Sequence, residues 1–261
     1  MPRKDADALA EVEALEAERA RRRHVFCPHE PTPRQAEFLK LDCLEALYGG
    51  AAGGGKSDAL LMAALQYVSV PNYAALVLRR TYADLSLPGA IMDRAKEWLI
   101  PRGIDWNDKE KRFTFPSGAT LTFGYLDTSR DRFRYQGAEL QFIGLDELTQ
   151  WGETDYRYLL SRLRRLEGSQ IPIRARAASN PGGQGHAWVK KRFVDPGSGR
   201  AFVPATLNDN PHLDAVAYRA SLAQLDSQTR RQLEHGEWVQ DASGLVYRFD
   251  CERNLIERLP P

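Results

Sequence analysis

The stretch that decides the fold is Gly50-Ala51-Ala52-Gly53-Gly54-Gly55-Lys56-Ser57, which matches G-x-x-x-x-G-K-[ST], the pattern of a phosphate-binding loop (P-loop). Residues 45–48 before it are typical of a short strand, and residues 58–68 after it have the apolar spacing of a helix. In a strand–loop–helix context, glycines turn backbone N–H groups toward a polyphosphate, and the helix N-terminus adds partial positive charge. The alternative is a glycine-rich turn that binds nothing, but such a turn would not need to lie between a strand and a helix. The sequence therefore predicts that the chain binds a nucleoside triphosphate.

Individual roles follow from the chemistry of this loop. We expect the Lys56 ammonium to reach the β- and γ-phosphates and the Ser57 hydroxyl to ligate Mg²⁺. Gln35 lies upstream, in a helix that Thr32 caps and Pro33 opens, and its amide can both donate to and accept from an adenine edge. A surface glutamine is an equally good interpretation. The residues expected to contact ATP from the loop are Gly50, Ala51, Ala52, Gly53, Gly54, Gly55, Lys56, Ser57 and Asp58.

A second apolar strand, residues 140–145, is followed directly by Asp146-Glu147. An apolar strand ending in Asp-Glu downstream of a P-loop is the Walker B pattern. Asp146 is expected to hold Mg²⁺ opposite Ser57, mostly through water, and Glu147 to activate the attacking water as a general base. An acidic pair in a turn is common by itself, but the P-loop upstream favours the catalytic interpretation. The second carboxylate favours hydrolysis over phosphoryl transfer to another substrate.

The other elements predict an α/β fold with a largely parallel sheet. Buried strands are expected at 73–78 and 171–178, helices at 91–99 and 155–166, and a β-hairpin from 112–115 and 120–123, whose aromatic side chains favour a core role. Ser179-Asn180 follows the strand at 171–178, at the edge of the sheet where a nucleotide would bind. A polar side chain there can contact the γ-phosphate or the attacking water. A turn chosen for its geometry is an equally good interpretation.

The formal net charge is only +1, so any surface that binds nucleic acid must be a local basic patch. The densest patch is predicted at Arg157, Arg162, Arg164 and Arg165, of which positions 157, 164 and 165 would share a helical face. Pairing with Asp155, Glu167 and neighbouring subunits is the competing interpretation. A second basic cluster is Lys190-Lys191-Arg192, for which a solvated face is the default interpretation. Three scattered cysteines indicate a reduced, intracellular setting, and no apolar run reaches membrane-spanning length.

The chain divides into three expected parts. Residues 1–29 are a charged arm, interpreted either as a helix that docks on a neighbouring subunit or on DNA, or as a solvated helix. Residues 30–245 are expected to form the P-loop domain, and 246–261 to begin a linker.

The order of these motifs resembles the N-terminal ATPase domain of the large terminase subunit of tailed bacteriophages, the family that packages viral DNA into procapsids. The resemblance covers roughly residues 30–250. It rests on the P-loop together with Leu78-Arg79-Arg80-Thr81, Leu145-Asp146-Glu147, Ala178-Ser179-Asn180-Pro181, Asn208-Asp209-Asn210-Pro211-His212-Leu213, Gly236-Glu237-Trp238 and Gly244-Leu245-Val246-Tyr247.

This resemblance implies an α/β P-loop NTPase of the additional-strand, catalytic-glutamate type, with a β-hairpin insertion. It implies ATP hydrolysis that drives double-stranded DNA into a procapsid, in the host cell cytoplasm and away from any membrane. The implied partners are a portal protein, a small terminase subunit and copies of the same chain in a ring, a pentamer on the portal. A metal-dependent nuclease with an RNase H-like fold would follow near residue 250; it is absent from this chain, so no DNA cleavage is predicted.

The resemblance also assigns residues. Its coupling motif falls on Ser179-Asn180 and its adenine-contacting glutamine on Gln35. Its trans-acting arginine precedes the Walker B strand, where Arg130, Arg132 and Arg134 lie, and Arg134 is the first choice.

Two other functions share the Walker motifs. One is a helicase-type or recombination ATPase, which would separate strands. The other is a nucleotide-gated assembly module with negligible turnover, against which Glu147 argues. A GTPase is disfavoured because the sequence has no Asn-Lys-x-Asp motif to read guanine.

Overall fold

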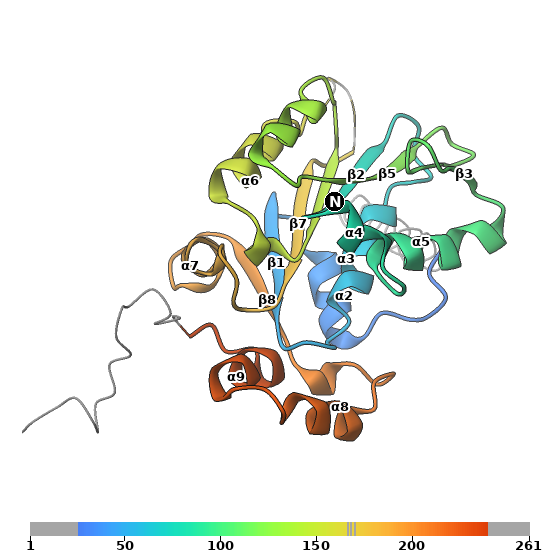
Figure 1. Cartoon of the computed structure of the whole chain (residues 1–261). Coiled ribbons are helices and arrows are strands. Elements are labelled where there is room, and N and C mark those ends of the chain that lie inside the picture. Colours follow the sequence, from blue (N-terminus) through green and yellow to red (C-terminus); the bar gives the residue numbers. More distant parts are fainter. Residues whose placement is uncertain (1–25, 166, 168, 170, 240–261) are drawn as a thin grey trace, which may run out of the picture.

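The computed structural model describes residues 26–239 except 166, 168 and 170 (Figure 1). Nearly all of the expected N-terminal arm and the whole of the expected linker therefore lie outside the described residues. Within the described part of the chain, no helix is both long and apolar enough to cross a membrane.

A single sheet organises the described residues, with strand order β3-β4-β5-β2-β6-β7-β1-β8. From β5 to β8 all neighbouring strands are parallel, and β3 and β4 pair antiparallel at one edge. This arrangement confirms the predicted α/β class with a largely parallel sheet. The strands are β1 (Glu45–Gly50), β2 (Ala74–Arg79), β3 (Asp105–Asn107), β4 (Arg112–Thr114), β5 (Thr120–Tyr125), β6 (Phe142–Asp146), β7 (Arg174–Ser179) and β8 (Ala201–Ala205).

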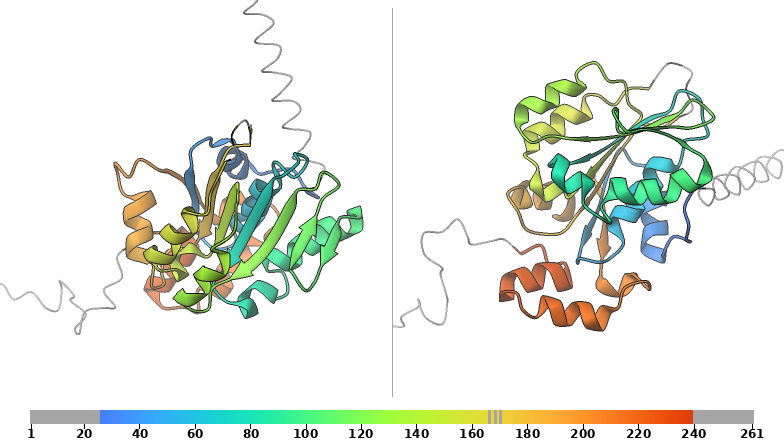
Figure 2. Two further views of the ribbon diagram at one scale, coloured as in Figure 1. Left: turned by 90° about the horizontal axis from the view of Figure 1, so that it is seen from above. Right: turned by 45° about the vertical axis from the view of Figure 1, so that its right-hand side comes forward.

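Helices cover both faces of the sheet (Figures 1 and 2). One core packs the sheet against α2 (Pro33–Lys40), α3 (Lys56–Leu65) and α5 (Ile91–Leu99), and the other packs it against α6 (Glu153–Leu160) and α7 (His186–Val189). Strand β2 is buried on both faces because Ala75 and Val77 enter the first core, whereas Leu76 and Leu78 enter the second. Such two-sided burial explains why β2 reads as a continuous apolar run.

The remaining helices are short or lie beyond the sheet. Helices α8 (Ala215–Leu222) and α9 (Ser227–His235) form a pair at the end of the sheet where β1 and β8 finish (Figure 1). We call them the helical pair. The short segments are α4 (Tyr82–Ser86), η1 (Ile100–Arg102), η2 (Ser129–Tyr135), η3 (Leu148–Gln150), η4 (Lys190–Val194) and η5 (Leu207–Asp209).

Several predicted elements need correction. The hairpin forms as β4–β5, and its four aromatic and leucine side chains are buried, but it is no separate insertion, because β5 also pairs with β2 in the main sheet. Strands β3 and β8 were not predicted. Strand β7 begins at Arg174, three residues later than the predicted start.

The helix predicted over 155–166 is wrong beyond Leu160. Past this point the chain turns and runs beside the start of β6, since the Arg164 N–H donates to the Leu140 carbonyl at 2.9 Å and the Leu140 N–H donates to the Arg162 carbonyl at 3.2 Å. Arg157 and Arg164 therefore do not share a helical face. Arg157 lies beside Glu153 and Arg164 beside Glu139, so both pair with acids, although not with the two acids expected.

Most of the basic cluster Lys190-Lys191-Arg192 is structural. Arg192 Nε donates to the buried Glu45 carboxylate at 2.9 Å, and the Tyr156 hydroxyl and Arg200 Nε donate to the same carboxylate. Burial acts to raise the pKa of Glu45, but these hydrogen bonds outweigh it and leave the pKa lowered. Lys190 pairs with Asp195 at 2.9 Å. Lys191 is the exposed member of the cluster.

Candidate nucleotide-binding site

The carboxyl ends of β1, β2, β6 and β7 meet at one edge of the sheet, where a pocket of about 250 Å³ opens beside the P-loop. Parallel strands deliver their following residues to the same edge, so residues far apart in the sequence converge there. The pocket is lined by Ala52, Gly53, Gly54, Gly55, Lys56, Ser57, Asp58, Gly89, Arg94, Glu147, Asn180 and Asn210. Gly50 and Ala51, predicted to contact the nucleotide, lie outside this lining.

Three P-loop glycines, Gly50, Gly53 and Gly55, have positive φ, and two of them illustrate why a side chain would not fit. Gly55 has φ of 72° just before α3, and a Cβ on it would lie 2.8 Å from the Gln35 amide nitrogen. Gly50 has φ of 141°, and a Cβ there would clash with the Ala205 carbonyl oxygen. Helix α3 begins at Lys56, so its first N–H groups face the pocket as the strand–loop–helix pattern predicted.

Lys56 is buried, and its ammonium donates to the Ala51 carbonyl at 2.5 Å. Burial lowers the pKa of Lys56 to about 8, although the negative charges of Glu147 and Asp146 act to raise it. The lysine is thus held against its own loop, next to the pocket that phosphates would fill.

The two predicted metal ligands lie together. Ser57 Oγ donates to Asp146 Oδ1 at 3.1 Å. Asp146 Oδ2 is buried and has no hydrogen-bond partner among the described residues, although Arg79 Nε lies 3.1 Å away without the alignment of a hydrogen bond. Burial raises the pKa of Asp146. A hydroxyl beside a carboxylate oxygen left without a hydrogen bond is a hard-oxygen donor set that fits Mg²⁺.

Glu147 lines the pocket in a strained conformation, with φ of 54° and ψ of 55°. Left-handed backbone is costly for a residue with a side chain, and such outliers concentrate at functional sites. Burial raises the pKa of Glu147, and the adjacent Asp146 carboxylate raises it further, while Lys56, Arg79 and the Asn180 backbone N–H act in the other direction. The predicted general base therefore faces the pocket with a raised pKa, as expected of a residue at a functional site.

The two residues of the predicted coupling motif are placed differently. Asn180 lines the pocket, and its Oδ1 is buried with no hydrogen-bond partner in the described chain. Ser179 is fully buried, and its hydroxyl accepts from the Thr149 N–H at 3.0 Å and lies 2.9 Å from Thr149 Oγ1. Through Thr149, Ser179 joins β7 to the segment that follows Glu147.

Gln35 supports the P-loop directly. Its amide nitrogen donates to the Gly55 carbonyl at 2.8 Å, and its amide oxygen accepts from the Thr32 N–H at 2.9 Å, completing a capping box at the start of α2. The side chain is 2% exposed. The predicted adenine contact stays a prediction: the amide keeps one N–H and one oxygen lone pair beyond these two bonds, but Gln35 is not among the residues that line the pocket.

Three comparisons with known proteins bear on these motifs. The sequence profile of the family described as "Terminase large subunit, T4likevirus-type, N-terminal" matches residues 47–253. This chain belongs to that family. A search of curated proteins found no match.

Solved terminases share the fold of this terminase chain. It superposes on the large terminase of a thermophilic bacteriophage with a TM-score of 0.62 at 15% identity, covering 81% of this chain and 54% of that one. It superposes on the large terminase of bacteriophage HK97 with a TM-score of 0.59 at 13% identity, covering 83% and 53%. The ATPase domain of the Thermus phage P74-26 large terminase gives 0.56 at 15% identity, covering 82% and 94%. The terminase chain thus spans about half the length of the first two proteins.

The helical pair of the terminase chain is bonded to the P-loop. The Ala52 N–H donates to the Leu233 carbonyl of α9 at 2.8 Å. Just before the pair, the Asn210 amide at the end of η5 donates to the Gly53 carbonyl at 2.7 Å. Asn210 belongs to a motif that the sequence singled out, but its place in the pocket was not predicted.

Arg94 was also missed, because it reaches the pocket from α5. Its guanidinium lies 2.6 Å from one Asp58 carboxylate oxygen, and His29 lies 3.2 Å from the other. The side chain of Asp58, a predicted nucleotide contact, is thus already paired.

The three arginines before the Walker B strand lie on η2. Arg134 pairs with Asp131 at 3.0 Å and stacks on Tyr125, with about half of its side chain exposed. Arg132 is held by the buried Asp155 at 2.9 Å. The exposed Arg130 guanidinium makes no ion pair or hydrogen bond with a described residue.

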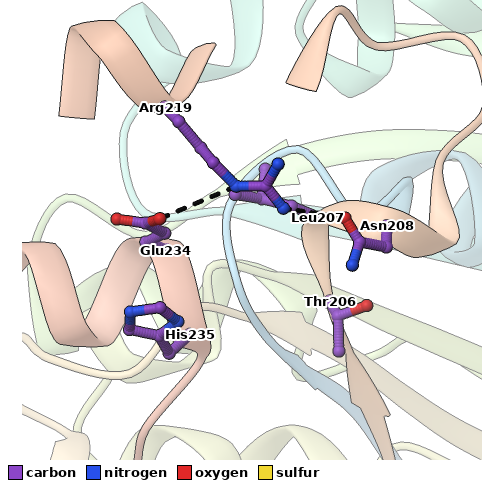
Figure 3. Close-up of a pocket in the computed structure, with 6 residues that line it drawn as sticks. All are labelled: Thr206, Leu207, Asn208, Arg219, Glu234 and His235. Atoms are coloured by element: carbon purple, nitrogen blue, oxygen red, sulfur yellow. Dashed lines mark hydrogen bonds and ion pairs between the residues drawn. The ribbon is translucent and has the colours of Figure 1, made fainter. Parts of the chain in front are cut away.

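A second pocket, of about 240 Å³, lies between η5 and the helical pair. Figure 3 shows the Arg219 guanidinium between Glu234 and Asn208, with hydrogen-bond and ion-pair partners on both sides. None of the six residues that line it belongs to the P-loop. Because its central cation is already paired, the pocket beside Lys56 is the candidate phosphate site.

The lowered pKa of Lys56 predicts a pH dependence of nucleotide affinity. Phosphates bind the charged lysine, which is the main form below about pH 8. Above that pH, binding must be accompanied by proton uptake, so ATP affinity should fall about tenfold per pH unit until the pKa of the complex is reached. Titrations with a fluorescent ATP analogue from pH 7 to 9.5 measure this slope. Lys56→Arg should flatten it, since arginine stays charged; an unchanged slope in that variant would assign the titration to another group.

Proposed function

We propose that this chain is the ATP-hydrolysing part of a DNA-packaging motor. The observation that carries the proposal is the convergence of Lys56, Ser57, Asp146 and Glu147 on one pocket beside a helix N-terminus. Membership of the terminase large-subunit family supports the same function, and one solved relative is described as a complex with ATP-γ-S.

Each residue of the pocket has a separate role in the proposed hydrolysis. The N–H groups at the start of α3 and the Lys56 ammonium bind the phosphates and offset their charge. The Glu147 carboxylate accepts a proton from the water that attacks the γ-phosphorus, and the Asn180 amide contacts that water or the γ-phosphate. Magnesium, when bound, would neutralise charge on the β- and γ-phosphates. Ser57 and Asp146 would hold it.

Hydrolysis is proposed to drive double-stranded DNA into a procapsid. The family supports DNA packaging, and the finer partners remain proposals: a ring of identical subunits, a pentamer on the portal, and contacts with the portal protein and the small terminase subunit. The bond from Ala52 to Leu233 of α9 and the bond from Asn210, at the end of η5, to Gly53 offer a path by which the state of the phosphate site reaches another part of the chain.

The DNA surface is proposed to include Arg164 and Arg165, which are exposed. Arg164 pairs with Glu139, but an exposed ion pair is worth only about 0–1 kcal/mol and is readily exchanged for a phosphate. The double variant Arg164→Ala/Arg165→Ala should bind duplex DNA more weakly regardless of sequence. Each lost phosphate contact should flatten the log–log salt slope by about 0.9.

Fluorescence anisotropy at several salt concentrations measures both quantities. Lys191→Ala, which removes a positive charge from an exposed position elsewhere, is the control. If the double variant keeps the wild-type DNA affinity and salt slope while Lys191→Ala binds DNA more weakly, the DNA surface lies at η4 instead.

A helicase-type ATPase is the alternative with the same Walker motifs. It predicts separation of the strands of a tailed duplex in the presence of ATP. The packaging motor predicts ATP turnover on blunt duplex DNA without strand separation, so one fluorescence-quenched duplex distinguishes them.

A further inference from the structure

One arginine side chain, that of Arg79, lies against both Walker B carboxylates. Arg79, the last residue of β2, places Nε 3.1 Å from Asp146 Oδ2 and Nη2 3.6 Å from Glu147 Oε1. Its Nη1 donates to the Asp84 carbonyl of α4 at 3.1 Å. One guanidinium therefore spans both Walker B carboxylates and is held on its far side by the backbone of α4.

The position of this guanidinium conflicts with metal binding. Asp146 Oδ2, the carboxylate oxygen that Ser57 does not use, lies 3.1 Å from Arg79 Nε, and both atoms are buried without a hydrogen bond. A pair of close charges without hydrogen-bond alignment is a weaker contact than a bidentate arginine–carboxylate pair. A divalent cation near Asp146 would repel the guanidinium and compete for the same carboxylate.

Without any cation, two adjacent carboxylates in a buried site repel one another. Lys56 supplies no direct contact here, because its ammonium lies on the Ala51 carbonyl and forms no ion pair with either acid. Arg79 is thus the cation that contacts the pair within the described chain.

We propose that Arg79 is a positioning residue that holds Asp146 and Glu147 in the metal-free site and is displaced from Asp146 when the metal binds. Arg79 and the metal are then competitors, and each nucleotide cycle exchanges one for the other. Because the guanidinium is also bonded to Asp84, its displacement would alter the contact between β2 and α4. This inference rests on the proposed nucleotide–metal site.

Competition predicts that removing Arg79 strengthens metal binding. Arg79→Gln keeps a polar side chain without the charge. With saturating ADP, it should bind Mn²⁺, used as a spin-active substitute for Mg²⁺, about tenfold more tightly than wild type, since charged residues in contact couple by about two- to hundredfold in equilibrium constant. Electron paramagnetic resonance of free Mn²⁺ measures the affinity without any turnover. Arg79→Lys, which keeps a charge but not the fork that spans both acids, should lie between.

Two further measurements separate this role from a structural one. Arg80→Gln removes the same charge one residue along the chain, from a guanidinium with no ion pair to a described residue, and should leave Mn²⁺ affinity unchanged. In thermal unfolding with ADP, Arg79→Gln should be less stable than wild type without metal and should gain more from added Mn²⁺. Equal or weaker Mn²⁺ affinity in Arg79→Gln, with normal binding by wild type, would overturn the inference alone. Failure of wild type to bind Mn²⁺ with ADP would overturn the proposed site as well.

Discussion

Replacing Arg134 by alanine is expected to lower ATP turnover of the assembled ring by about 10³–10⁵-fold, the range measured for arginines that act across an interface in phosphoryl transfer. ATP affinity of the isolated chain should stay nearly unchanged, because Arg134 does not line the nucleotide pocket of its own subunit. Its partner Asp131 lies on the same short helix, and the Arg134 side chain is itself about half exposed, so little free energy opposes a move to a neighbouring subunit.

The neighbouring arginines provide matched controls. Arg132→Ala should disturb folding more than turnover, since Arg132 pairs with the buried Asp155 and stacks on Phe133 and Tyr158. Arg130 is exposed and equally able to cross an interface. A loss of turnover in Arg130→Ala with normal turnover in Arg134→Ala would transfer the role to Arg130.

Mixing variants tests whether the arginine acts in trans. Rings that contain both Arg134→Ala and Lys56→Ala subunits should recover part of the activity, because each subunit supplies what its neighbour lacks. Phosphate release, with mixed assembly verified by mass photometry of tagged subunits, measures the recovery. No recovery in verified mixed rings would indicate an arginine that acts within its own subunit.

Glu147→Gln should retain ATP binding and lose hydrolysis by about two orders of magnitude or more, the scale of losing a general base. The amide keeps the size of the side chain in its left-handed backbone position but cannot accept the proton of the attacking water. Binding should tighten modestly, because one negative charge near the phosphates is removed.

The control for this charge change is Glu97→Gln, at an exposed position of α5. It should hydrolyse ATP at the wild-type rate. Near-wild-type turnover in Glu147→Gln would remove Glu147 from the role of base.

Local sequence patterns predicted the parallel core and the P-loop. The P-loop, the strand before Asp146-Glu147 and the buried run of β2 each carry their signal within a few residues, so they could be placed without knowledge of contacts. The Ser57–Asp146 pair was predictable for the same reason, since two separate motifs meet wherever parallel strands end at one edge.

The remaining features depend on contacts between distant residues. Arg79 reaches the Walker B acids, and Arg94 reaches Asp58, because of how β2 and α5 pack, and neither arginine lies in a pattern that states its partner. Strand β8 contains Pro204 and lies at the edge of the sheet, which weakens its strand signal. The helix expected through residue 166 ends early because pairing with the start of β6 outweighs a helical pattern of modest strength.

The central claim is that the pocket beside Lys56 hydrolyses ATP. A single-turnover assay tests it most directly, with the chain in excess over γ-labelled ATP and with Mg²⁺, in the presence and absence of blunt duplex DNA. We expect phosphate release by wild type that requires Mg²⁺, increases with duplex DNA and is lost in Glu147→Gln, while both proteins retain bound ATP. Wild-type protein that binds ATP and releases no phosphate under any of these conditions would contradict the claim and favour a nucleotide-gated assembly module.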